Sequence, residues 1–125
     1  GAQDSVIQPY DELPTFQFNG HTYRVAPEAS NSMTGQNAEI FCNNLTLYGY
    51  TDWRLPTKDE LLQMCNEKYQ IGGWSSYSGV YWSGTIPSEA SHAFNHVNFN
   101  GCTVGWTSRT ATDYLRRVRP IRLEN

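Results

Sequence analysis

The sequence predicts an α+β domain in which two helices are followed by a strand-rich second half. Two segments, at about 35–46 and 58–68, repeat apolar residues at the spacing of an amphipathic helix. From about residue 79 the chain changes to short alternating segments separated by turn signals such as Asn100-Gly101. A length of 125 residues suits one domain with its own core. Helices and strands that are separated along the chain in this way are typical of the α+β class.

The chain begins with a polar, proline-containing segment, which is followed by a hairpin signal. We predict an N-terminal arm or tether at residues 1–15 and a single domain over residues 16–125. Asn19-Gly20 lies between two alternating runs and favours a two-residue turn. The predicted hairpin therefore spans about 15–26.

The first helix follows a loop at 27–35 that is rich in Pro, Ser, Asn and Gly. Its apolar residues recur at i, i+3, i+4 and i+7, which places them on one helix face. These residues are Ala38, Phe41, Cys42 and Leu45. We expect this face to pack on the core.

The second helix has the strongest local signals in the sequence. Pro56 biases the residue before it toward an extended conformation. Thr57 is a preferred N-cap residue, and Glu60 lies three positions later, as in a capping box. We expect Trp53 to be a buried indole and Arg54 to be a cation that bonds loop carbonyls. The helix should end before the Gly72-Gly73 pair.

Later segments of the chain are expected to be strands at 79–85, 91–99, 102–107 and 114–122. The first should be buried through Val80 and Trp82. In the second, Ala93, Val97 and Phe99 share a face with Asn95, which is an anomaly for an apolar face.

The three cysteines, Cys42, Cys65 and Cys102, permit one disulfide and leave one thiol. Cys42 and Cys65 both lie on apolar helix faces, so inert buried thiols and a bridge are equal alternatives. No cysteine and histidine spacing suits a zinc site.

The composition favours a binding surface over several other classes of function. Aromatic residues reach 14% while charged residues make up 17%, with a net charge of −3. Surfaces rich in Tyr, Trp, Asn and Ser resemble recognition faces, although any β-rich domain could share this composition. The sequence has no basic block apart from a series of arginines near its end, namely Arg116, Arg117, Arg119 and Arg122. Nucleic acid is therefore not expected as a partner.

Export is expected from the start of the chain, and no transmembrane segment is expected. We interpret Gly1 as the remnant of a tag and Ala2 as a trimmed mature start, so that a signal peptide has been removed. No apolar run approaches the length that spans a bilayer.

Neither a metal, a cofactor nor a catalytic centre is predicted. His92 and His96 are four residues apart in a predicted strand, which separates them by ~13 Å, too far to share one ion. The familiar calcium-binding strings of lectins, such as Glu-Pro-Asn, are absent. Ser83 and Ser108 have no neighbouring base that can be recognised in the sequence.

A series of motifs resembles the bacterial Lcl C-terminal-domain family. The motifs are AEIFCNNL at 38–45, GYTDWRLPT at 49–57, YWSGT at 81–85, VNFNG at 97–101 and VRPIR at 118–122. The resemblance covers about residues 33–122 and implies a C-type lectin-like fold. That fold group includes lectins, formylglycine-generating enzymes and hypervariable binding proteins, so fold alone does not fix function. The resemblance also makes residues 119–122 a structural closing motif.

In lectin-like folds the late strands and their loops form the ligand face. Applied to this chain, the resemblance implies a binding surface at three places, namely 72–79, 91–100 and 105–113. The candidate ligand-binding residues are Trp74, Ser76, Tyr77, His92, His96, Asn98, Asn100, Trp106, Ser108 and Arg109. As alternatives, Trp106 belongs to the core and the Asn and Ser residues form turns. For Trp74, exposure and burial are equally expected.

The resulting hypothesis is a non-catalytic ligand-binding module of an exported, adhesin-like bacterial protein. It would be secreted or attached to the cell surface as a lipoprotein, and it would bind a glycan or a surface protein. Some relatives act as adhesins for sulfated polysaccharides. One alternative is an assembly domain that buries the same face in a partner subunit or a homo-oligomer. A less favoured alternative is an oxidoreductase like the formylglycine-generating enzymes, whose paired cysteines have no counterpart here.

Overall fold

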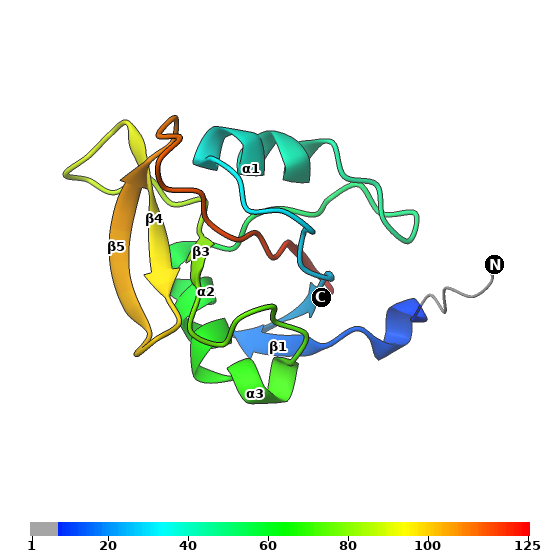
Figure 1. Ribbon diagram of the computed structural model, residues 1–125. Coiled ribbons are helices and arrows are strands. Elements are labelled where there is room, and N and C mark those ends of the chain that lie inside the picture. Colours follow the sequence, from blue (N-terminus) through cyan, green and yellow to red (C-terminus); the bar gives the residue numbers. More distant parts are fainter. Residues whose placement is uncertain (1–7) are drawn as a thin grey trace.

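The computed structural model describes residues 8–125, in which three α-helices lie beside two small antiparallel sheets (Figure 1). The first sheet has the order β1-β2-β6, formed by Thr15–Phe18, His21–Val25 and Ile121–Leu123. The second has the order β3-β4-β5, formed by Val80–Trp82, Ala93–Asn98 and Thr103–Ser108. The predicted α+β class is confirmed, and the finer C-type lectin-like assignment stays a prediction.

The first sheet joins the two ends of the described chain. β1 and β2 form the predicted hairpin, in which Asn19 and Gly20 both have positive φ, at 51° and 78°. A type I′ turn requires this conformation, and Asn-Gly adopts it at low cost. β6 then pairs antiparallel with β2, with Ile121 opposite Val25.

The segment before β1 packs onto the domain. Of the arm predicted at 1–15, residues 1–7 lie outside the described residues. Tyr10–Glu12 forms a short 3₁₀ turn, η2, and Leu13 behind it is buried. Arg122 Nη1 donates to the Tyr10 hydroxyl, and that hydroxyl donates to Glu124, which attaches the turn to the C-terminal strand.

The continuous last strand predicted at 114–122 is wrong, because only Ile121–Leu123 forms β6. The preceding residues are extended but change partners repeatedly. Arg116 exchanges hydrogen bonds with Met33, whereas Arg117 bonds to β3. Pro120 lacks an N–H group, so it cannot donate to a ladder. The segment therefore links the two sheets instead of extending one of them.

Helix α1 spans Gly35–Asn43 and ends before the expected limit at residue 46. Thr34 is its N-cap and accepts a hydrogen bond from the Asn37 amide at 3.2 Å. The helix starts against the second sheet, because a Cβ at Gly35 would lie only 3.2 Å from the Trp82 ring. Trp82 is fully buried, as predicted, and its indole donates to the Met33 carbonyl.

Helix α2 spans Lys58–Asn66, and α3 follows at Lys68–Ile71. The predicted capping box is confirmed: the Glu60 amide donates to Thr57 Oγ1 at 3.2 Å, and the Thr57 amide donates to Glu60 Oε1 at 2.8 Å. Trp53 is buried, and its indole donates to the Leu47 carbonyl. Gly72, with φ of 67°, ends α3 as expected.

Arg54 has a stronger partner than the loop carbonyl expected for it. Its guanidinium donates to both oxygens of Glu60, at 2.8 and 2.9 Å, and also to the Leu55 carbonyl. Burial alone would raise the pKa of Glu60, but the hydrogen bonds from Arg54 and Thr57 outweigh it and hold that pKa below its ordinary value.

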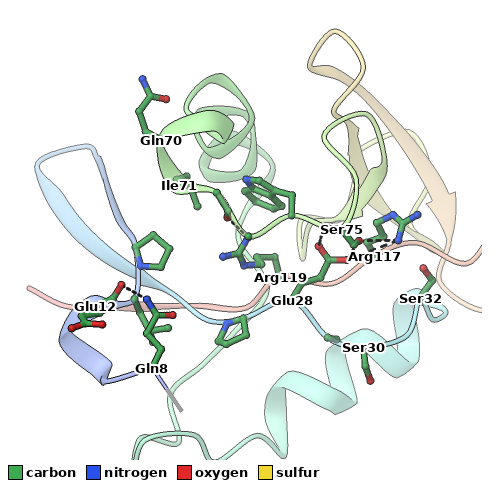
Figure 2. Close-up of a pocket in the computed structure, with 17 residues that line it drawn as sticks. Gln8, Glu12, Glu28, Ser30, Ser32, Gln70, Ile71, Ser75, Arg117 and Arg119 are labelled. Carbon is green, nitrogen blue, oxygen red and sulfur yellow. Dashed lines mark hydrogen bonds and ion pairs between the residues drawn. The ribbon is translucent and has the colours of Figure 1, made fainter. Parts of the chain in front are cut away.

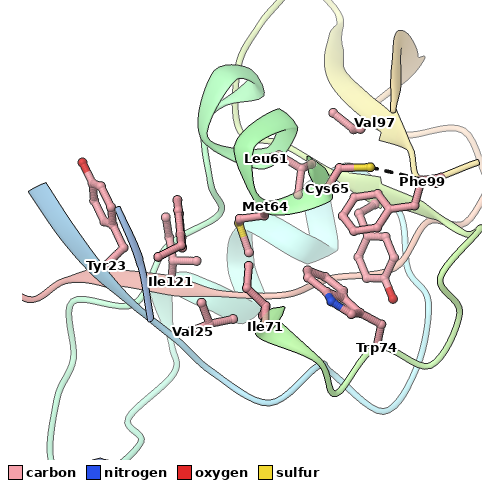
Figure 3. Close-up of a cluster of buried hydrophobic side chains, with 12 residues drawn as sticks. Tyr23, Val25, Leu61, Met64, Cys65, Ile71, Trp74, Val97, Phe99 and Ile121 are labelled. Carbon is pink, nitrogen blue, oxygen red and sulfur yellow. Dashed lines mark hydrogen bonds between the residues drawn. The ribbon is translucent and has the colours of Figure 1, made fainter. Parts of the chain in front are cut away.

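The main core lies between the first sheet, α2 and the second sheet (Figure 3). Leu61 and Met64 of α2 meet Tyr81 and Val97 of the second sheet in this cluster, together with Phe99, which follows β4. The Cys65–Cys102 disulfide ties α2 to the turn before β5, which settles the alternatives left by the cysteine pattern. Cys42 is free and buried in α1, and burial raises the pKa of its thiol to about 12.

Candidate functional site

The most exposed aromatic surface of the second sheet lies around β5, an outer strand of that sheet. Trp106 on β5 is 44% exposed, and Tyr114 in the following segment is 58% exposed. A shallow hollow of about 320 Å³ lies between these rings. The hollow is lined by Trp106, Thr107, Ser108, Ala111, Tyr114 and Arg116, and we call it the Trp106 hollow.

The base of the Trp106 hollow is polar. Thr107 Oγ1 accepts from Arg116 Nε and Nη2, both at 3.2 Å, and lies 2.8 Å from His96 Nδ1. The Arg116 guanidinium also lies over the Tyr114 ring, 5.4 Å from its centroid. Arg116 has no carboxylate within 4.0 Å among the residues that the structure describes. A partly buried cation without a counter-ion therefore borders the hollow.

His96 is a supporting residue and is not free on the surface as expected. Its ring lies against Gly105, where a Cβ would come within 2.5 Å of Nε2. Burial and the nearby Arg116 charge lower the pKa of His96 to about 4, so the imidazole is neutral at pH 7. A neutral ring can exchange one hydrogen bond with Thr107 and hold that hydroxyl in place.

Of the predicted site residues, the structure brings Trp106 and Ser108 together in the hollow. His92 is exposed beside them, with its ring centroid 5.5 Å from that of Trp106 in an edge-on arrangement. Arg109 is occupied elsewhere, because it donates to the Ser91 and Ala93 carbonyls. These bonds give Arg109 a structural role at the start of β4.

The remaining candidates lie outside this hollow. The Asn98 side chain accepts from the Asn100 amide at 2.9 Å, which makes both residues part of the β4–β5 turn. Tyr77 stacks on Tyr69 with ring centres 5.4 Å apart, and Tyr69 is 76% exposed. Ser76, next to Tyr77, accepts from the Ser78 amide and so also stabilises a turn.

Trp74 is not an exposed aromatic plate, so its place among the ligand-stacking residues is corrected. It is only 6% exposed, and its ring packs edge-on against Tyr81 at 5.0 Å and against Phe99 at 4.8 Å. Its indole N–H donates to the Lys68 carbonyl. The Arg119 guanidinium covers a further face at 4.5 Å from the ring centroid. Side chains from distant parts of the sequence thus cover the Trp74 ring.

Asn95 resolves the anomaly in the β4 pattern. Its side chain is buried, and its side-chain amide donates to the Gly105 carbonyl at 3.1 Å. Its backbone carbonyl accepts from the Ser83 hydroxyl at 2.7 Å. A buried polar residue that has its hydrogen bonds satisfied is compatible with an apolar face.

A second concave region is partly lined by Trp74 and holds about 900 Å³. Figure 2 shows the residues that line it. Its walls come from the segment 8–14, the loop 27–32 and the segment 70–75, with Arg117 and Arg119 between them. We call it the Arg119 groove. No sequence pattern points to this groove, because its walls are far apart along the chain.

Glu28 organises one end of the Arg119 groove. Its carboxylate accepts from the Ser75 amide at 3.0 Å and from the hydroxyls of Ser75 and Tyr81. Arg117 Nη1 lies 4.0 Å from the same carboxylate and donates to Ser75 Oγ at 2.9 Å. Burial and the bond to Glu28 raise the pKa of Tyr81 above its ordinary value. The negative charge of Glu28 is therefore already compensated within the protein.

Residues 8–125 can be compared with what a membrane-spanning helix and a metal site require. None of the described helices combines the length and apolarity needed to cross a bilayer. Within the same residues, no three side chains of His, Cys, Asp or Glu gather where they could hold a metal ion.

The described elements define an α+β domain whose concave sites are open at the surface. Residues 13–119 match the Lcl C-terminal domain family. Because this match covers more than half of the chain, the protein belongs to that family, and the resemblance seen in the motifs is confirmed. No curated protein matches the chain.

Proposed function

We propose that this domain is a non-catalytic glycan-binding module of an exported bacterial surface protein, and that the Trp106 hollow is its binding site. The observation that carries the proposal is the pair of exposed rings, Trp106 and Tyr114, on either side of a hollow with a polar base. The proposal keeps the late-strand location predicted from the sequence but narrows it to one hollow.

The chemistry of the hollow suits a sugar ring. An indole presents a flat apolar face that can pack on the C–H groups of a pyranose, while its edge stays in water. Hydroxyl groups of the sugar need donors and acceptors close to that face, which Ser108 and Arg116 can supply. Arg116 is held in place by its two bonds to Thr107, so little conformational entropy is lost on binding.

An assembly role is the second candidate, and a specific observation favours it. Val104 and Leu115 are also exposed close in sequence to the two rings, so the surface contains several large apolar side chains. Such a group on an outer strand could instead pack against a second subunit. Light scattering after size exclusion separates the two functions. A dimer in wild type that becomes a monomer in Trp106→Ala would favour assembly.

An oxidoreductase role is less well supported. Cys65 and Cys102 are joined in a structural bridge between α2 and the β5 turn. The remaining thiol, Cys42, is buried and has a strongly raised pKa, which disfavours the reactive thiolate.

A glycan array probed with the wild-type domain and the variant Trp106→Ala tests the proposal. We expect wild type to bind a defined group of glycans, and Trp106→Ala to bind them at least about fivefold more weakly, since one stacked aromatic ring contributes about 1 kcal/mol or more. Tyr69→Ala is the matched control, because Tyr69 is an exposed ring outside the hollow. Equal losses in both variants, or no glycan binding by wild type, would refute the assignment.

A further inference from the structure

The Arg119 groove contains a buried cation that is not paired with a carboxylate of residues 8–125. Arg119 is 3% exposed, and no Asp or Glu oxygen lies within 4.0 Å of it among the described residues. Its Nε donates to the Ala26 carbonyl, and its Nη1 donates to the Gly72 carbonyl at 2.9 Å. Burial lowers the pKa of Arg119 to about 10, which still leaves the guanidinium charged at pH 7.

The third nitrogen of Arg119, Nη2, remains available. It has no hydrogen-bond partner in residues 8–125, and yet it is not sealed in the core. Arg24 Nε is the only described side-chain atom that is both fully buried and unpartnered. Figure 2 shows the Arg119 guanidinium in the middle of the residues that line the groove. Within residues 8–125, Nη2 is therefore an unpartnered donor of a charged, rigidly held group, and it is not fully enclosed.

Gly73 is what leaves Nη2 uncovered. A Cβ at this position would lie 3.1 Å from Nη2, and the residue has a φ of +76°. A side chain here would therefore cover the nitrogen as well as strain the backbone. The groove next to Arg119 is open because a glycine lies beside the guanidinium.

The Arg119 groove also has an apolar part. Leu13, Pro14, Pro27 and Ile71 line the groove and come from three different segments of the chain. A ligand there would meet one free charged donor and several hydrocarbon surfaces. Glu28 is already satisfied by its own partners, so it does not neutralise Arg119 directly.

We propose that the Arg119 groove is a binding site for a small organic carboxylate with an apolar body. The carboxylate would accept from Arg119 Nη2 beside Gly73, and the apolar body would lie against the wall of Pro14, Pro27 and Ile71. Hydrogen bonds between a guanidinium and a carboxylate are among the stronger ones, particularly where water is partly excluded. This site shares no lining residue with the Trp106 hollow, so it adds a second ligand to the proposed glycan.

A titration followed by ¹H–¹⁵N NMR tests the proposal with hydrocinnamate and its neutral amide, hydrocinnamamide. We expect hydrocinnamate to saturate shifts at the amides of Gly72, Gly73 and Ser75, and the amide compound to bind at least about tenfold more weakly. Equal affinity for acid and amide, or shifts confined to other parts of the protein, would overturn the proposal. If sulfate bound to the same residues as tightly as hydrocinnamate does, the proposed contact between the ligand and the apolar wall would be wrong. These comparisons use wild-type protein, so they decide the question whether or not a variant folds.

Two glycine variants then locate the carboxylate. Gly73→Ala should weaken hydrocinnamate binding at least about fivefold, because its methyl group covers Nη2. Gly20→Ala is the matched control: Gly20 has a similar φ, +78°, but nothing lies within 4 Å of a Cβ there. Gly20→Ala should therefore bind like wild type. Undiminished binding by folded Gly73→Ala would contradict a carboxylate at Nη2.

Discussion

Two tripeptides in this protein have the same local pattern but differ in how far their tryptophan side chains are exposed. Gly73-Trp74-Ser75 and Gly105-Trp106-Thr107 each place an indole between a glycine and a hydroxyl residue. The first indole is buried in the main core, and the second is nearly half exposed.

The difference arises from what lies next to each segment. Trp74 follows a glycine with positive φ after α3, which directs the chain toward Tyr81 and Phe99, and Arg119 then covers the ring. Trp106 lies on β5, an outer strand with β4 on one side only. The exposure of these aromatic residues is therefore set by segments that are distant in the sequence and pack on them.

The largest effect is expected from truncating the buried indole. Trp74→Ala should lower the free energy of unfolding by about 3–5 kcal/mol, because it removes ring contacts and leaves a cavity. Trp106→Ala should lower it by less than about 1 kcal/mol. Urea denaturation of both variants measures the difference, and equal losses would remove the distinction between the two rings.

The next largest effect on the free energy of unfolding is expected for Arg119, the residue that covers Trp74. Arg119→Met should cost about 2 kcal/mol or more, because the Ala26 and Gly72 carbonyls lose their donor. Arg116→Met, the control beside Trp106, should cost less than about 1 kcal/mol, since its bonds go to a hydroxyl that also contacts His96. A larger loss for Arg116→Met in urea denaturation would reverse this order.

Loss of a helix cap, which depends on neighbouring residues only, provides a reference value for the two stability effects above. Thr57→Ala should cost about 1 kcal/mol, because α2 loses the hydrogen bond to the Glu60 amide. The control Thr46→Ala changes a threonine that is exposed and outside the helices. If thermal and urea unfolding moved by no more than a few tenths of a kcal/mol, the cap would be unimportant.

The histidine that packs under the Trp106 hollow should make stability depend on pH. The pKa of His96 is lowered from 6.5 to about 4 in the folded state, so the unfolded chain binds more protons between these values. The contribution of His96 is therefore present above pH 6.5 and is lost as the pH falls toward 4. Glu60, Asp52 and Glu124 have lowered pKa values and act in the same direction only at still lower pH.

Urea denaturation at pH 7 and pH 5 measures this dependence. The loss of stability between the two pH values should be smaller in His96→Gln than in wild type. His92→Gln, which changes the exposed histidine beside Trp106, is the matched control. An unchanged dependence in His96→Gln would contradict the buried, neutral ring.

The smallest effect is expected from metal removal. Packing, hydrogen bonds and one disulfide account for the ordering of both tryptophan segments, so EDTA should leave the melting temperature unchanged. A decrease of several degrees in a thermal scan would mean that a bound ion stabilises the native state.

Much of the framework could be predicted from the sequence, since it depends on neighbours in the chain. The Asn19-Gly20 turn, the Thr57 capping box and the burial of Trp53 follow from local backbone geometry and short-range patterns, and the structure confirms each. Predictions that required knowledge of distant partners were less successful. The continuous strand at 114–122 was wrong because the segment passes between two sheets.

The candidate sites divide in the same way. Trp106 and Ser108 could be proposed from the sequence because the family resemblance and the aromatic pattern point to the late strands. Tyr114 was assigned only to a strand, and its exposure beside Trp106 has no local signature. The Arg119 groove could not be anticipated, since its walls come together only in the folded chain.

The helix starts and the hairpin follow from the sequence, because hydrogen bonds and dihedral preferences over a few residues decide such features, and the motifs identify the family. Which cysteines pair, which tryptophan is buried and where Arg119 Nη2 lies without a described partner depend on the folded chain. Each of these outcomes depends on contacts between residues far apart in the chain, such as Cys65 with Cys102 and Arg119 with Trp74. Local patterns carry no information about those contacts, because the same short sequence can meet different neighbours.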